Sequence, residues 1–344
     1  MDIYFLDNGF QARYVLDNFS SLIWTKRYFT YGDFELYTSA TPEITAALAA
    51  YPYIARDDDD SVMIVENVKI STDAENGDYY TITGRSLESV LTRRIVWAQT
   101  TIDVDDPAEG IYQLLAENVT DPEISARKID DFTVDTSFVW TGELQTQFTG
   151  TQLDEAITAI CKGNGFGWKI TAENGGMMFS LYAASATDVT FSPEFDNLIT
   201  STYYRNGEKY KTVAVVAGEG EGAARRRNVV DAAPSATGIH RREVYVDARD
   251  ISSNNGEIGD TDYMALLAAR GEQKLIEEHS ETHGFEGEID PSGTYKYKTD
   301  YNLGDIVTVS NGYGVTDTPR IVEIIECWDD TGYKVVPTFE KWEV

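Results

Sequence analysis

Two histidines form the most specific candidate for metal chemistry in the chain. His279 and His283 lie four residues apart near the end of a predicted helix, a spacing that places two imidazoles on one face. The zinc protease signature has a glutamate directly after the first histidine, and here Ser280 takes that position. The pattern favours a solvated helix end, and we expect no metal ligands.

A glycine-rich stretch is the candidate for a phosphate-binding loop. Residues 218–223 read GEGEGA after an apolar strand and formally match the GxGxx[GA] pattern of dinucleotide-binding proteins. Glu219 and Glu221 would repel phosphate, and the following RRRNVVDAAPSA lacks an amphipathic helix whose N-terminus could face it. We therefore predict a flexible loop here and no dinucleotide cofactor.

The main basic cluster of the sequence consists of Arg225–Arg227 together with Arg241 and Arg242. A nucleic-acid site would combine such residues with interleaved aromatic side chains and a favourable overall charge, and the sequence shows neither. Two interpretations stay open, a solvated loop and a contact with an acidic neighbouring subunit. Both are favoured over DNA binding.

Four consecutive aspartates, Asp57–Asp60, could supply oxygen ligands to calcium. The glycine and glutamate that complete an EF-hand loop are absent, so the pattern favours an exposed, solvated run. Carboxylate pairs for glycoside cleavage are conceivable in a chain with 58 acidic residues, but no spacing singles out a pair. We name no catalytic, cofactor-binding or metal-binding residue and expect a protein without enzymatic activity.

The composition is strongly acidic. The 344 residues carry a formal net charge of −30, which disfavours attraction to nucleic-acid phosphates or anionic lipid. This charge serves solubility, or a surface past which DNA slides without binding. The length is sufficient for two or three domains.

The ends and the cysteines indicate where the chain matures. Cys161 and Cys327 are the two cysteines, too few for a disulfide framework. Met1 leads into DIYFLDNGF, which lacks the features of a secretory signal, and no apolar run approaches the roughly 20 residues of a membrane helix. We expect synthesis in a reducing cytoplasm.

The first part of the chain reads as mainly β. Residues 19–38 predict two strands joined at a tight turn, and Thr41 is the expected N-cap of a short helix. Residues 62–84 predict a hairpin that turns at 75–77, and Ser86 should cap the helix that follows. We predict that residues 1–98 form a first β-barrel domain.

The middle of the chain changes in pattern. Helices are predicted to start at Asp106 and at 151, the second ending at Gly163, and residues 165–183 predict a hairpin that turns at 174–176. We predict that residues 99–188 form an inserted α+β domain.

The last part returns to β structure. Strands are predicted within 211–218 and 240–248, separated by a mobile loop, and Thr261 should cap an accessory helix of about 261–279. The buried positions expected on this helix are Tyr263, Leu266, Leu267 and Leu275. We predict that residues 189–344 form a second β-barrel domain.

The two ends of the chain resemble each other. IVENVKI at 64–70 matches IVEIIEC at 321–327, and each follows a Gly-Asp turn, at Gly32 and at Gly304. The first separation exceeds the second by about the length of the segment PEITAALAAYPYIAR. A helix inserted into a hairpin loop would explain the difference, so the pattern predicts two related β-barrels.

A family resemblance rests on two segments. The run YNLGDIVTV at 301–309, followed by PRIVEIIE and a Pro-Thr-Phe ending, resembles the tail hub proteins of siphoviruses, and TITGRSLESVLTRRIV near 81–96 looks like the segment that closes their first barrel. The resemblance implies an α+β, mainly β fold of two tail-tube-like β-barrels with an inserted small α+β domain. It also implies a homotrimer whose six barrels form a ring that continues the tail tube.

The resemblance further implies a structural tail-tip or baseplate hub in the virion, with a DNA-exit channel and no cofactor. The implied partners are the distal tail or tail tube protein, the tape measure protein, and spike or receptor-binding proteins, while DNA passes without specific binding. Many relatives continue into a fibre or a peptidoglycan-cutting domain, whereas this chain stops at Val344. We therefore expect partner chains to carry receptor binding and lysis.

Two other functions are compatible with a β-rich sequence. One is a tail-tip enzyme that degrades peptidoglycan or polysaccharide. The other is a carbohydrate-binding module, suggested by 21 tyrosines and 6 tryptophans, although two barrel cores would also use these residues.

Overall fold

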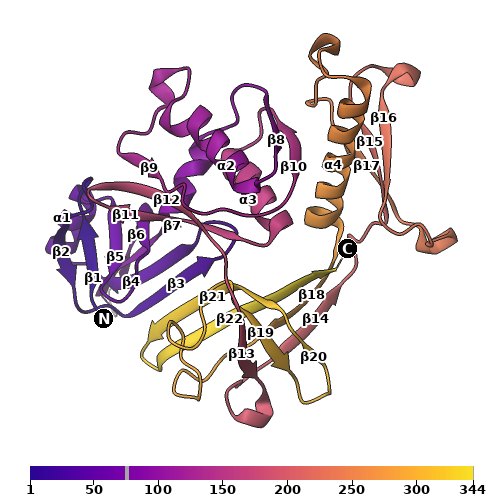
Figure 1. Cartoon of the computed structure of the whole chain (residues 1–344). Coiled ribbons are helices and arrows are strands. Elements are labelled where there is room, and N and C mark those ends of the chain that lie inside the picture. Colours follow the sequence, from indigo (N-terminus) through magenta and orange to yellow (C-terminus); the bar gives the residue numbers. More distant parts are fainter. Residues whose placement is uncertain (74–76, 344) are drawn as a thin grey trace.

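The computed structural model describes residues 1–73 and 77–343, and the fold is mainly β with a few helices (Figure 1). The largest sheet of this part of the chain has 14 strands, drawn from both ends of the sequence. The predicted α+β, mainly β fold class is confirmed. Closure of the sheets into barrels remains a prediction.

The N-terminal strands form what we call the first repeat. It contains helix α1 (Pro42–Ala50) and the strands β1 (Ile3–Leu6), β2 (Ala12–Leu16), β3 (Ser21–Arg27), β4 (Asp33–Ser39), β5 (Tyr53–Arg56), β6 (Val62–Asp73) and β7 (Gly77–Ser86). The Thr41 hydroxyl accepts from the backbone N–H of Ile44, which confirms the predicted N-cap. Of the predicted turn at 75–77, only Gly77 lies within the described residues, and its φ is +87°.

The helix expected after Ser86 differs in kind and in its cap. Leu87–Arg93 is a 3₁₀ helix; Ser86 occupies the predicted N-cap position, but its side chain makes no capping hydrogen bond. The Ser86 hydroxyl instead accepts from the backbone N–H of Gly32 at 2.8 Å, a buried contact between this segment and the β3–β4 turn. The Ser86 hydroxyl, which the local pattern assigns to the helix N-terminus, is therefore used in a tertiary contact with Gly32.

The middle of the chain forms two small sheets and two helices. Its elements are β8 (Thr100–Val104), α2 (Pro107–Leu115) with a π-helical turn (Ala116–Thr120), a 3₁₀ turn (Ser125–Arg127), β9 (Phe132–Val134), β10 (Leu144–Phe148), α3 (Leu153–Asn164), β11 (Gly167–Glu173) and β12 (Gly176–Tyr182). Asp106 caps α2 as predicted. Helix α3 ends at Asn164, one residue later than predicted, because Gly165 adopts the left-handed conformation with φ +78° and forms the C-cap.

A second small unit lies between strands of the C-terminal sheet. It contains β15 (Val213–Ala217), β16 (Arg227–Asp231), β17 (Glu243–Asp247) and α4 (Asp260–His279), with 3₁₀ turns at Gly222–Ala224, Gly238–His240 and Asn254–Gly256. The expectation of a loop between the two predicted strands is wrong, since β16 pairs with β15. The four predicted helix positions are buried, but Gly259 rather than Thr261 precedes the helix as N-cap.

The remaining strands form what we call the second repeat. They are β13 (Ala186–Phe191), β14 (Thr202–Asn206), β18 (Glu281–Glu286), β19 (Ile306–Ser310), β20 (Thr316–Asp317), β21 (Arg320–Asp329) and β22 (Gly332–Glu343), with a 3₁₀ turn at Pro193–Phe195. This repeat has its own core, which includes Phe191, Phe285 and Phe339. The proposed domain limits at residues 98 and 188 remain predictions.

The two repeats share one order of paired strands. The first runs β3-β4-β7-β6-β5-β1, and the second runs β14-β18-β22-β21-β19-β13. Each order contains an irregularity at the same place, between Val65 and Asn67 in β6 and between Ile321 and Glu323 in β21. A shared bulge as well as a shared order supports the predicted repeat.

The structure corrects the alignment of the repeats in two respects. The Gly304 turn leads into β19, which takes the position of β5 rather than that of β4. The bulge aligns Val65 with Ile321, one residue away from the match of IVENVKI with IVEIIEC. Short apolar strand segments are too uniform in composition to define their own register.

The repeats are joined edge to edge within the chain. Residues 22–27 of β3 pair antiparallel with 323–328 of β21, so the edge strand of the first repeat continues the sheet of the second. On the same side of β21, Arg320 is paired with Ile306 of β19. One edge of β21 therefore pairs with β19 of its own repeat and with β3 of the first repeat.

Candidate functional site

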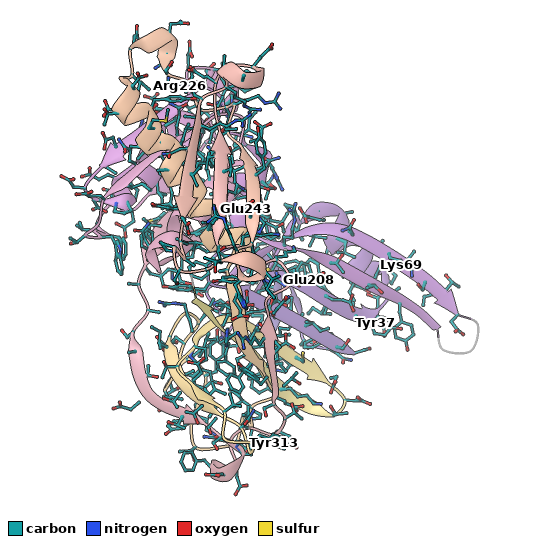
Figure 2. The ribbon with its side chains drawn as sticks, turned by 90° about the vertical axis from the view of Figure 1, so that its right-hand side faces the viewer. Tyr37, Lys69, Glu208, Arg226, Glu243 and Tyr313 are labelled. Carbon is teal, nitrogen blue, oxygen red and sulfur yellow. The ribbon has the colours of Figure 1, made fainter. Side chains whose placement is uncertain are left out.

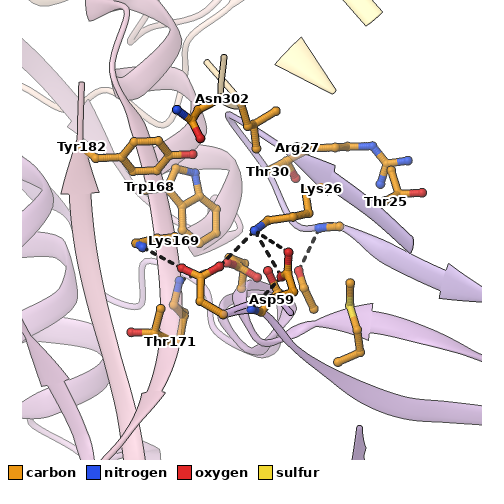
Figure 3. Close-up of a pocket in the computed structure, with 18 of the residues that line it drawn as sticks. Thr25, Lys26, Arg27, Thr30, Asp59, Trp168, Lys169, Thr171, Tyr182 and Asn302 are labelled. Carbon is orange, nitrogen blue, oxygen red and sulfur yellow. Dashed lines mark hydrogen bonds and ion pairs between the residues drawn. The ribbon is translucent and has the colours of Figure 1, made fainter. Parts of the chain in front are cut away.

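A pocket of about 420 Å³ lies where three parts of the chain meet (Figure 3). The first repeat contributes Lys26 and Asp59, the middle of the chain contributes Trp168 and Lys169, and the second repeat contributes Lys298. The β3–β21 joint brings the two repeats together at this position. Any group that bound here would contact both repeats and the inserted elements at once.

Asp59 is the centre of the charges around the pocket. Its carboxylate is fully buried and lies 3.2 Å from the Lys26 ammonium and 2.8 Å from that of Lys298. Burial alone would raise the pKa of Asp59, but the two lysines outweigh it and hold the pKa well below its usual range. Asp60 extends the network, with Lys26 and Lys169 each at 3.0 Å.

A second ion pair lies behind the pocket, between Arg56 and Glu326. The Arg56 guanidinium also binds Asp58 at 2.8 Å and lies over the ring of Trp328, 4.2 Å from its centroid. The Tyr333 hydroxyl donates to Glu326 at 2.8 Å. Both charged side chains are thus buried with several partners, as buried charges require.

Glu88 is an acid of the pocket wall that is held by hydrogen bonds. It accepts from the backbone N–H of Ile170 at 3.1 Å, which links the first repeat to β11. Burial raises the pKa of Glu88, although hydrogen bonds from Ser86 and Ile170 oppose this shift. Trp168 makes a parallel link, donating its indole N–H to the Phe29 carbonyl at 2.9 Å.

The arrangement is suited to holding chain segments together. The acids Asp59 and Asp60 are matched by lysines from three segments, and Glu88 accepts from a backbone N–H. The expectation that Asp57–Asp60 is a solvated run is wrong for Asp59. Sequence reasoning missed Lys26, Lys169 and Lys298, which lie far from one another in the sequence and form no motif.

The two histidines of the metal candidate do not share a helix face. Helix α4 ends at His279, whose ring bonds to the Lys209 carbonyl, and His283 lies in β18 beside the Tyr203 hydroxyl at 3.1 Å. Within residues 1–73 and 77–343, no group of three or more His, Cys, Asp or Glu side chains is arranged to hold a metal ion.

The glycine-rich stretch packs within its own unit. The Glu219 carboxylate accepts from the backbone and hydroxyl of Ser253, and the Glu219 N–H donates to the Tyr263 hydroxyl at 2.8 Å. The helix that follows is a single 3₁₀ turn, Gly222–Ala224, too short to present an anion site. The absence of a dinucleotide cofactor stays a prediction.

Three arginines of the basic cluster have acidic partners in the same chain. Arg226 lies 3.8 Å above the ring of Tyr263 and 2.7 Å from Asp260. Arg225 binds Asp247 at 2.6 Å, and Arg241 binds Asp231 at 2.9 Å. The aromatic neighbours that the sequence pattern did not reveal are therefore present. These three charges are paired within the chain, and the contact with an acidic neighbouring subunit stays a hypothesis.

Solved structures with a similar fold include three that are described as tail proteins. A tail protein from Neisseria meningitidis MC58 matches with a TM-score of 0.59 and 11% identity, over 99% of this chain and 96% of that one. The 43 kDa tail protein of prophage MuSo2 from Shewanella oneidensis matches with a TM-score of 0.57 and 13% identity, over 98% of both chains. The prophage tail protein gp18 from Listeria monocytogenes EGD-e matches with a TM-score of 0.53 and 10% identity, over 98% and 94%.

Two further comparisons complete the assignment. No curated protein matches the sequence. In the described residues, no helix combines the length and the apolar character needed to span a membrane. The model of the Siphovirus ReqiPepy6 Gp37-like protein family matches residues 1–339. The predicted resemblance to siphovirus tail proteins is thus confirmed, and the chain belongs to the Siphovirus ReqiPepy6 Gp37-like protein family.

Proposed function

We propose that this protein is a structural hub of the virion tail tip, in which three copies form a ring that continues the tail tube. The observation that carries the proposal is the duplication of the sheet. Two repeats with one strand order lie edge to edge in each chain, so three chains supply six similar units.

The physics of the sheet supports a closed assembly. An edge strand exposes unpaired backbone groups and tends to pair with another chain unless it is covered. A ring of repeats covers such edges and gives a rigid wall. The net charge of −30 suits a channel for DNA, since acidic side chains form no contacts with phosphates that would retain it.

The proposed hub docks to the distal tail or tail tube protein and the tape measure protein on one side. Spike or receptor-binding proteins dock on the other. The nearly complete coverage of three tail proteins from different bacteria supports a position in the tail. The internally paired charges of the pocket support a structural role, because a rigid joint between repeats is what a ring wall needs.

Cryo-electron microscopy of purified virions tests this proposal. The expected density at the tail tip is a ring of three copies around a continuous channel. Particles in which this chain is absent, or in which it lies outside the tail axis, would overturn it. Light scattering on the full chain in solution gives an independent measure, with a trimer mass as the expected result.

The runner-up function, a hydrolase of peptidoglycan or polysaccharide, has no observation in its favour at the pocket. Asp59 and Asp60 are held by lysines, and Glu88 is held by a backbone N–H. A zymogram with peptidoglycan and a glycan release assay should show no turnover. Activity that disappears on replacing one carboxylate would instead establish the enzyme.

A further inference from the structure

Each repeat leaves a strand edge open within the described residues. Strand β6 is longer than its neighbour β5, which pairs only with Val62–Ile64, and within the described chain no strand pairs with the same edge of β6 at 67–72. At the other end of the sheet, β14 pairs with β18 and its outer edge carries no strand from the described residues.

The open half of β6 exposes apolar side chains. Val68 and Ile70 are 47% and 55% exposed, although both pair across the sheet with buried residues of β7, Ile82 and Tyr80. The β6–β7 hairpin projects from the body of the molecule, where Lys69 marks its position (Figure 2). Exposed apolar residues on an open strand edge are characteristic of a surface that another strand covers.

In the second repeat, the half of β21 that corresponds to the open half of β6 is paired with another strand. Since the bulges align Asn67 with Glu323, Val68 corresponds to Ile324 and Ile70 corresponds to Glu326. Ile324 and Glu326 are buried, with exposures of 0% and 2%. Ile324 belongs to the core of the second repeat, Glu326 is bound by Arg56 of the first repeat, and β3 of the first repeat pairs with this half of β21.

The strand that corresponds to β3 is β14. The alignment follows from cross-strand pairing, through β4 and β7 in the first repeat and through β18 and β22 in the second. It places Thr25 at the position of Tyr204. Trp24 then aligns with Tyr203 and Lys26 with Arg205, so both strands have an aromatic residue two positions before a cation. The covering strand of the internal joint therefore has a counterpart whose outer edge is open.

We propose that β14 of one copy pairs antiparallel with the open half of β6 of the next copy, repeating between chains the β3–β21 joint that exists within the chain. The register of the β3–β21 joint predicts the register of the joint between chains. It places Arg205 opposite Val68, Tyr203 opposite Ile70, and Thr202 opposite Ser71. The inference rests on the proposed ring and specifies how its copies are joined.

This joint has the geometry that a ring requires. Each copy presents one β14 edge and one β6 edge, so the contact is head to tail and can close after a fixed number of copies. Tyr203 covers Ile70 as an aromatic and β-branched cross-strand pair, a favourable combination on one sheet face. Every repeat then has the same neighbours on both sides, whether the joint lies within a chain or between chains.

Disulfide cross-linking tests the register. Ser71→Cys and Thr202→Cys are combined in a Cys327→Ser background, and the full chain is oxidised in solution and in virions that carry the variant. Ser71 and Thr202 are exposed, and facing residues of antiparallel strands lie about 4.5–5.5 Å apart, within disulfide range. The expected result is a covalent multimer on a non-reducing gel.

The matched control combines Thr72→Cys with Thr202→Cys. A shift of one residue places the two side chains on opposite faces, so this pair should not cross-link. Thr72 is exposed like Ser71, and the control therefore has the same accessibility. Cross-linking of the control pair in place of the test pair would overturn the proposed register.

Failure of the joint is distinguishable from failure of the ring. A trimer by light scattering or in virions without the Ser71–Thr202 cross-link overturns the joint and leaves the hub intact. Absence of any ring in virions overturns the proposed function itself.

Ile70→Lys should reduce assembly at least tenfold with unchanged thermal unfolding of the single chain. Val229→Lys, at another exposed apolar position, should leave assembly unchanged.

Discussion

Arg56 and Glu326 form a buried ion pair that joins the two repeats, with 3.0 Å between a guanidinium nitrogen and a carboxylate oxygen. Arg56 ends β5 and Glu326 lies in β21, 270 residues away in the sequence. The two side chains are 0% and 2% exposed. The internal joint therefore has a charged centre as well as backbone pairing.

Glu326→Ala should strongly destabilise the fold. The substitution leaves Arg56 buried with Asp58 as its remaining acid partner, and removing one partner of a buried pair costs about 3–5 kcal/mol. Urea unfolding followed by tryptophan fluorescence measures the free energy. Glu243→Ala is the control, since its ion pair with Arg241 is exposed and should contribute less than about 1 kcal/mol.

Replacing both partners should cost less than replacing one. Arg56→Met with Glu326→Leu removes both buried charges and restores apolar packing, so its free energy of unfolding should exceed that of Glu326→Ala. A double variant as unstable as the single variant would show that the hydrogen bond from Tyr333, rather than the unpaired arginine, dominates the effect.

Acid should weaken the network around Asp59. Its pKa is lowered in the folded chain, so its contribution to stability is present above the unfolded pKa of about 3.9 and is lost as pH falls toward the folded value. Asp59→Asn should therefore reduce the loss of stability below about pH 4, as well as destabilise the chain at neutral pH. Asp188→Asn, at an exposed position, is the control and should change the free energy of unfolding at neutral pH by less than about 0.5 kcal/mol.

Glu88→Gln should change the stability at neutral pH in the opposite direction to Asp59→Asn. Because burial raises the pKa of Glu88, the folded chain is disfavoured as pH rises above the unfolded value of about 4.3. The glutamine keeps an acceptor for the Ile170 N–H and removes the charge. The variant should be more stable than wild type at pH 7 and similar to it at pH 3.5, as measured by thermal unfolding at both pH values. A loss of stability at pH 7 would contradict this account.

Gly84→Ala should destabilise the bulge of the first repeat. A Cβ at Gly84 would clash with the Ile64 carbonyl oxygen, which belongs to the backbone and moves only with the strand. Such overpacking costs about 1–3 kcal/mol. The urea midpoint provides the measurement. Gly312→Ala is the control, because a Cβ at this position would have no atom within 4 Å and the change should be near zero.

Much of the local structure was predictable from the sequence. The Thr41 and Asp106 caps and the turn at Asn174 and Gly175 use short-range chemistry between neighbouring residues. The repeat was also visible, as two strand segments with a common pattern. Its register was not, since the bulges that align Val65 with Ile321 depend on pairing with another strand.

The charged junction could not be predicted in the same way. Lys26, Asp59 and Lys298 are distant in sequence, and an ion pair between distant residues leaves no periodic signal. Asp59 therefore resembles its exposed neighbour Asp57 until the fold buries it.

The sequence by itself determined the strand and helix periodicity, the acidic charge and the resemblance of the two ends, because these depend on residue types and short spacings. Only the tertiary structure decided which strand edge meets which, which aspartate is buried, and where β6 and β14 remain open. Each of these depends on backbone hydrogen bonds and charges brought together from distant segments, whose energies are set by the assembled fold.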